Sequence, residues 1–211
     1  MMTNMSTNQD DLAYLPNLLE GDRGAEMRHK FGVVYLLCGV VWVPYILLVW
    51  AQMTKLAPIS EVWTGRAWLI AMILFIGSMI WGLMPKRAVS KTTSNRAFGA
   101  AFAGIGYSYL VMLTVLVYLS YERKNGIFAL IYAVVVFAGQ GAGWYVAWVL
   151  QRQAWFGIVA IGWYVAALIT GLNVLNIENF LLCAAVSMLV LMALPGFVMI
   201  QKSVAPGTPE S

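Results

Sequence analysis

Residues 127–150 read IFALIYAVVVFAGQGAGWYVAWVL and contain no charged side chain. As a helix this stretch would rise about 36 Å, which exceeds the roughly 30 Å of a bilayer's hydrocarbon core. Near its middle, Gln140 lies beside Gly139 in a GQGAG sequence that ends at Gly143. Glycines four residues apart let a second helix approach closely, and a neutral amide can hydrogen-bond to it. The stretch therefore predicts a membrane-spanning helix inside a packed bundle.

The composition of the whole chain is that of a membrane protein. Of its 211 residues, 61% are hydrophobic and 10% are charged, whereas a soluble domain has about 25% charged residues. The charged residues cluster between long apolar runs, which is typical of a chain that crosses a bilayer several times. Because the basic residues flank these runs and form no separate patch, we expect the lipid bilayer as a partner and no nucleic acid.

The apolar runs predict an all-α fold, a bundle of six transmembrane helices. Three regions are expected: an N-terminal segment with a short amphipathic helix (1–30), the membrane domain (31–200) and a disordered tail (201–211). Pro44 predicts a kink in the first span, and Pro195-Gly196 predicts an interruption in the sixth. The predicted spans are residues 31–52, 67–84, 97–121, 127–150, 155–175 and 180–200.

The positions of the basic residues predict the orientation, because cytoplasmic loops carry an excess of Lys and Arg. With six spans, one side receives Arg23, Arg28, Lys30, Lys86, Arg87, Lys91, Arg96, Arg152 and Lys202. The other side receives only Lys55, Arg66, Arg123 and Lys124. Both termini are therefore predicted to be cytoplasmic.

The segment before the first span has an amphipathic pattern. In DDLAYLPNLL, residues 10–19, the spacing places Leu12, Leu15 and Leu19 on one face of a helix that Gly21 and Gly24 are expected to end. One hypothesis is that residues 10–24 bind a protein partner. The other is that this short helix folds against the bundle.

No Asp, Glu, Lys, Arg or His falls inside a predicted span. Ionisable residues within a membrane usually mark proton relays, ion paths and catalytic centres. Paired histidines for a haem and a histidine or carboxylate cluster for a metal are missing as well. We therefore expect no catalytic, cofactor-binding or metal-binding residue and a protein that is not an enzyme. Cys38 and Cys183, predicted at different depths, are expected to be free thiols.

The polar residues near the centres of the spans are neutral. They either converge on a small pocket for an uncharged ligand or hydrogen-bond between helices, at about 0.6 kcal/mol per bond. Gln140 is the central candidate, because a buried amide cannot stay unpaired. A GWYVA sequence occurs at 143–147 and again at 162–166, but membrane spans give such matches easily by chance and we infer no repeat. The candidate residues are Ser78, Ser108, Tyr109, Gln140, Tyr164 and Ser187.

Small residues indicate where helices pack. In the third span Gly99 pairs with Ala103, and Ala100 pairs with Gly104, at the spacing of a small-xxx-small motif. Together with Gly139 and Gly143, these residues predict close packing of the third and fourth spans. The alternative is a seam between two copies of the chain in a homo-oligomer.

Three short motifs carry a resemblance: DLAYL at 11–15, EGDR at 20–23 and Asn95-Arg96-Ala97 at the start of the third span. They resemble a set of bacterial inner-membrane proteins of similar length, which share an acidic amphipathic opening helix, an E-G-x-R turn and an N-R-x-x-x-A sequence. The chain departs from that pattern at Pro16 and Asp22. The family has no assigned function, so the resemblance implies only a location in the bacterial inner membrane.

These observations lead to two hypotheses of function. The first is a non-enzymatic inner-membrane protein that acts through interactions, in assembly or regulation. The alternative is a small transporter or channel for a neutral or hydrophobic solute, with a polar pocket near Gln140. The alternative requires the polar residues of the spans to face one cavity.

Overall fold

The computed structural model describes residues 6–83 and 93–204, and every regular element in those two ranges is helical. The elements are α1 (Ser6–Met53), α2 (Glu61–Leu83), α3 (Thr93–Arg123), α4 (Ile127–Gln151), α5 (Ala154–Leu172), α6 (Ile177–Met188), the π-helical turn η1 (Leu189–Ala193) and α7 (Leu194–Val204).

Six stretches of these helices are long and apolar enough to cross a membrane. The prediction of an all-α chain with six membrane-spanning helices is thus confirmed for the described residues, and the chain is a multi-pass membrane protein. The stretches are Arg28–Met53, Glu61–Gly82, Phe102–Arg123, Ile127–Gln151, Ala154–Leu172 and Ile177–Ser203.

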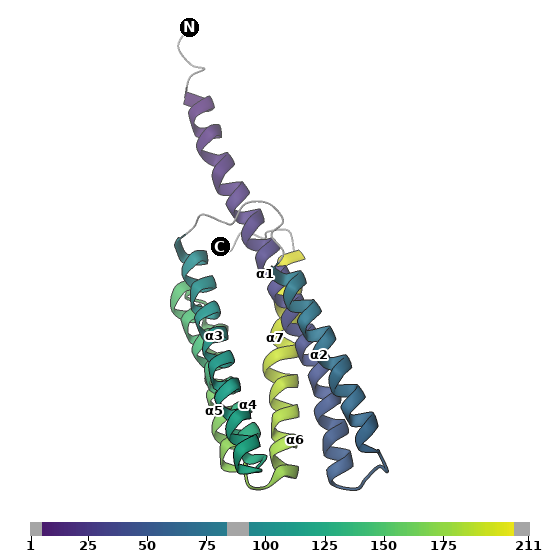
Figure 1. The fold of residues 1–211 in the computed structure, drawn as a ribbon. Coiled ribbons are helices and arrows are strands. Elements are labelled where there is room, and N and C mark those ends of the chain that lie inside the picture. Colours follow the sequence, from purple (N-terminus) through teal and green to yellow (C-terminus); the bar gives the residue numbers. More distant parts are fainter. Residues whose placement is uncertain (1–5, 84–92, 205–211) are drawn as a thin grey trace.

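The helices form two groups that run side by side (Figure 1). In one group α1 packs along α2, α6, η1 and α7; in the other, α4 packs between α3 and α5. The contact of α5 with α6 joins the groups. Only 6% of the span residues are buried in α2 and in α3, against 44% in α5. The helices α2 and α3 therefore lie at the periphery, where apolar side chains face the lipid.

The first helix is much longer than predicted. The prediction that Gly21 and Gly24 end a short helix is wrong, because α1 continues from Ser6 to Met53. A glycine inside a helix costs about 1 kcal/mol relative to alanine but removes no hydrogen bond, so it weakens a helix without ending it. Residues 6–27, which we call the arm, precede the first span, and Figure 1 shows that this part of α1 projects beyond the bundle.

The predicted interruption of the sixth span lies one turn before Pro195. Proline cannot donate a backbone hydrogen bond, and its ring clashes with the carbonyl four residues earlier. The chain widens there into η1, Leu189–Ala193, and the N–H of Leu194 binds the carbonyl of Leu189. The π-helical turn thus relieves the clash, and α7 continues the span beyond it.

Close backbone contact holds α7 against α1. A Cβ atom on Gly196 would lie 2.6 Å from the backbone nitrogen of Leu36 and 2.8 Å from the carbonyl oxygen of Gly32. A Cβ atom on Gly32 would in turn lie 2.9 Å from the carbonyl oxygen of Gly196. Only glycine permits this approach at both positions.

Several predicted boundaries change. The predicted tail begins at residue 201, but α7 continues to Val204, and the rest of the tail lies outside the described residues, as does the loop 84–92. The fifth span ends at Leu172 rather than at 175, and the second and sixth begin earlier than expected.

Cys38 and Cys183 are free thiols, the first buried and the second partly exposed.

Candidate functional site

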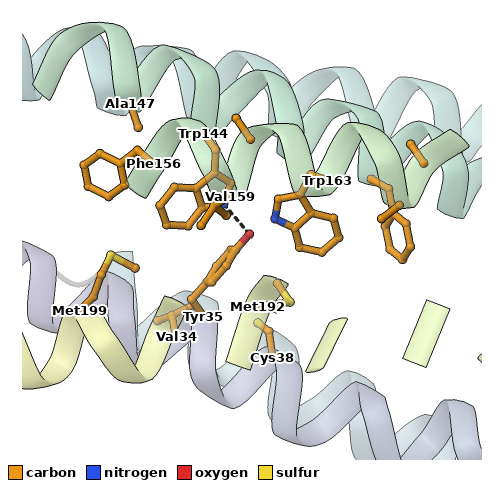
Figure 2. Close-up of a cluster of buried hydrophobic side chains, with 14 of the residues drawn as sticks. Val34, Tyr35, Cys38, Trp144, Ala147, Phe156, Val159, Trp163, Met192 and Met199 are labelled. Carbon is orange, nitrogen blue, oxygen red and sulfur yellow. Dashed lines mark hydrogen bonds between the residues drawn. The ribbon is translucent and has the colours of Figure 1, made fainter. Parts of the chain in front are cut away.

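The hydroxyl of Tyr35 on α1 is a buried polar group that links two helices of the described bundle. The indole Nε1 of Trp144 donates a hydrogen bond of 2.7 Å to this oxygen, drawn as a dashed line in Figure 2. The Tyr35 hydroxyl donates in turn to Oε1 of Gln140, at 3.1 Å. Tyr35 and Trp144 are 5% and 1% exposed, so the hydrogen bond between them is shielded from lipid and water, whereas the bond to Gln140 is partly buried. We call Tyr35, Gln140, Trp144 and Trp163 the Tyr35 centre.

The spacing of α4 explains how this site forms. Gln140 and Trp144 are four residues apart, so their side chains lie on the same face of the helix, one turn apart. Both face α1, where Tyr35 accepts a hydrogen bond from Trp144 and donates one to Gln140. Buried polar groups must find partners, and here three of them satisfy one another across two helices. The site therefore connects the two groups of helices.

Aromatic rings enclose the Tyr35 hydroxyl. Phe31 stacks on Tyr35 with ring centroids 5.5 Å apart, and Trp144 packs edge-on against Tyr35 at 5.4 Å. On its other side Trp144 contacts Phe156 at 5.4 Å and Trp155 at 5.7 Å. Stacked and edge-to-face aromatic pairs contribute about 0.5–1.5 kcal/mol each beyond the area they bury. The rings thus fix the position of the hydrogen-bonded groups.

Trp163 of α5 completes the centre, with its indole nitrogen on the side of the Tyr35 hydroxyl (Figure 2). The side chain is 1% exposed, and its N–H makes no hydrogen bond of acceptable geometry. Trp144 and Trp163 occupy the same position of the two GWYVA sequences. Sequence reasoning missed both tryptophans, although that recurrence and their mid-span positions were signals.

Of the six predicted polar residues, only Gln140 belongs to the Tyr35 centre. Ser78 and Ser108 each donate to a backbone carbonyl of their own helix, at 2.8 and 3.0 Å. Tyr164 is 44% exposed on α5, and Ser187 is partly exposed on α6. These side chains lie on different helix faces, and the structure does not bring the six together around one pocket.

The small residues of α3 do not form the predicted contact. Ala103 and Gly104 are exposed, and a Cβ atom on Gly104 would have no atom within 4 Å. Ala100 is exposed as well, and the surroundings of Gly99 lie outside the described residues. The prediction that this small-residue face packs on the fourth span is therefore wrong for the residues described.

The helices α3 and α4 nevertheless pack together, through aromatic rings above glycines. A Cβ atom on Gly143 would lie 2.9 Å from the ring of Phe102, and one on Gly139 would overlap the ring of Tyr109. The Tyr109 hydroxyl donates to the carbonyl of Val136 at 2.7 Å. Gly139 and Gly143 thus serve helix packing as predicted, with aromatic rings of α3 as their partners.

The chemistry available to the Tyr35 centre is hydrogen bonding by neutral groups. Within residues 6–83 and 93–204, no three His, Cys, Asp or Glu side chains gather in a way that could hold a metal ion.

No protein-family model matches the sequence, and comparisons with curated proteins and with solved structures give no significant match.

Proposed function

We propose that this chain is a non-enzymatic protein of the bacterial inner membrane that acts through contacts with a protein partner, in assembly or regulation. The arm is the contacting element, and both termini are cytoplasmic. The unequal distribution of Lys and Arg supports this orientation, and the resemblance of the motifs in the arm and at the start of α3 supports the location.

The observation that carries the proposal is the continuity of α1. The arm is about 33 Å long at 1.5 Å per residue, and it joins the first span without a break. A rigid helix that projects from a bundle holds a binding surface at a fixed place relative to the membrane. By sequence spacing, Leu12, Leu15 and Leu19 share one face of this helix, as in amphipathic helices that dock into apolar grooves.

The test compares the proteins that co-purify with variants of the arm from native membranes. Leu12→Ser with Leu15→Ser changes the apolar face, and Tyr14→Ser with Asn17→Ser changes the opposite face as a matched control. We expect at least one protein to co-purify with both the full chain and the control. The same protein should be lost from the leucine variant and from a chain lacking residues 1–24. A partner list that is the same for all four proteins would refute the proposal.

A small carrier or channel for a neutral solute is the second candidate. The polar residues of the spans do not face one cavity, which counts against it. One observation favours it: the buried N–H of Trp163, on the side of the Tyr35 hydroxyl, makes no well-formed hydrogen bond, so a solute with an acceptor oxygen would find a donor there. Proteoliposomes challenged with glycerol or urea in stopped-flow light scattering test this candidate. Permeability no higher than that of empty liposomes would count against it.

A further inference from the structure

The arm projects from the end of the bundle where α4 is followed by α5 and where α7 ends (Figure 1), and basic residues lie at these points of the sequence. We call Arg28 of α1, Arg152 between α4 and α5, and Lys202 of α7 the basic collar. All three side chains are exposed, and each lies within one residue of the end of a candidate span. Residues at span ends lie at the depth of the lipid headgroups.

Two contacts join the helices that carry the collar residues. Nδ1 of His29 lies 3.0 Å from the hydroxyl of Ser203, which donates its own proton to the carbonyl of Ile200 at 2.6 Å. The imidazole is therefore the donor, and the bond ties the residue after Arg28 to the residue after Lys202. The ammonium of Lys202 in turn lies 5.5 Å from the ring centroid of Trp155, three residues beyond Arg152.

The two ends of the bundle differ in charge. At the collar end the basic residues Arg28, Lys30, Arg152 and Lys202 are accompanied by Glu26, two residues before the first span, so four positive charges and one negative give +3. The acidic residues nearest to them in sequence lie on the arm, ending with Glu26. At the opposite end the described basic residues Lys55, Arg66, Arg123 and Lys124 are accompanied by Glu61, Glu122 and Glu178, so four positive and three negative charges give +1.

We infer that the basic collar binds the headgroups of anionic phospholipids. Guanidinium and ammonium groups at the headgroup level attract a lipid phosphate, and each contact strengthens binding by about fivefold. The Trp155 ring beside Lys202 has an apolar body and a polar edge, which suits the boundary between headgroups and acyl chains. This inference is independent of the proposed protein partner, because it involves the ends of the spans and not the arm.

The experiment measures phosphatidylglycerol bound to the detergent-purified full chain by native mass spectrometry, with phosphatidylcholine as the zwitterionic comparison. Arg152→Gln with Lys202→Gln removes two charges from the collar. Arg123→Gln with Lys124→Gln removes two from the opposite end as the matched control. We expect the collar variant to bind phosphatidylglycerol about 25-fold more weakly, about fivefold for each charge removed, and the control to stay within about twofold of the original chain.

Three outcomes would overturn the inference: equal loss in both variants, equal binding of the two lipids, or displacement of phosphatidylglycerol by inorganic phosphate at the same concentration. The last would indicate a site for soluble anions. Thermal unfolding in detergent without added lipid checks that the collar variant is folded. If the collar variant does not fold, the single substitution Arg28→Gln is used in its place. Unchanged binding of phosphatidylglycerol by Arg28→Gln would also contradict the inference.

Discussion

At the scale of single residues, one hydroxyl organises the interior of the bundle. Tyr35 accepts from Trp144 and donates to Gln140, so it uses both capacities of its oxygen where neither water nor lipid is available as a substitute. The sequence predicted that Gln140 would find a partner but not which one. Tyr35 lies 105 residues away in the chain, and no local pattern reports a contact of that range.

Tyr35→Phe tests this role. The substitution leaves the N–H of Trp144 without its partner in a buried place, which costs about 1–3 kcal/mol, whereas the amide oxygen of Gln140 is only partly buried and adds little. We expect the free energy of unfolding in detergent to fall by about 1–3 kcal/mol. Tyr107→Phe, at a position that is 71% exposed, is the control and should change the free energy of unfolding little. Equal stability of the two variants would contradict the assignment.

The two central tryptophans provide a second, paired test. Trp144 and Trp163 are both 1% exposed, but only the N–H of Trp144 makes a well-formed hydrogen bond. Replacement by Phe removes similar volume at both positions. The difference between the two losses in the free energy of unfolding therefore reports the hydrogen bond. We expect Trp144→Phe to lower the free energy of unfolding by about 1 kcal/mol more than Trp163→Phe does. The reverse order, measured by chemical denaturation, would mean that Trp163 is the principal donor to Tyr35.

At the scale of elements, apolar length predicted which segments are helices but not how they meet. The six runs are 19 to 27 residues long, within or above the range of about 17–25 residues that crosses a bilayer, which is why the spans could be found without a structure. The outward-facing Ala103 and Gly104 show the limit, since a small-residue motif permits close packing without choosing a partner. The helix break predicted at Gly21 failed for a related reason, because glycine lowers helix propensity without excluding a helix.

The contact of α1 with α7 predicts a strong effect of one methyl group. Gly196→Ala would place a Cβ atom 2.6 Å from the backbone of Leu36, and backbone cannot rotate away as a side chain can. We expect a loss of about 1–3 kcal/mol in the free energy of unfolding, the range found for overpacked cores. Gly77→Ala on α2 has open space around it and should leave stability unchanged or slightly raised. Comparable thermal midpoints for both variants would refute the packing.

At the scale of the whole molecule, the bundle is asymmetric along its axis. The arm and the basic collar occupy one end, and the opposite end carries short turns with nearly balanced charge. Composition and the count of Lys and Arg predicted this polarity. The contact of Lys202 with the Trp155 ring depends on tertiary packing and could not be predicted. We propose that two parts of this end make contacts: the arm binds a protein, and the collar binds anionic lipid.

Labelling of single cysteines with a membrane-impermeant maleimide tests six crossings with both termini cytoplasmic most directly. In a cysteine-free background, cysteine replaces Ser60, Asn125, Asn176 or Gln153, all of which are exposed at turns between spans. We predict that intact cells are labelled at the first three positions, and at Gln153 only after permeabilisation. Labelling of Gln153 in intact cells, or protection of any of the other three, would contradict the account.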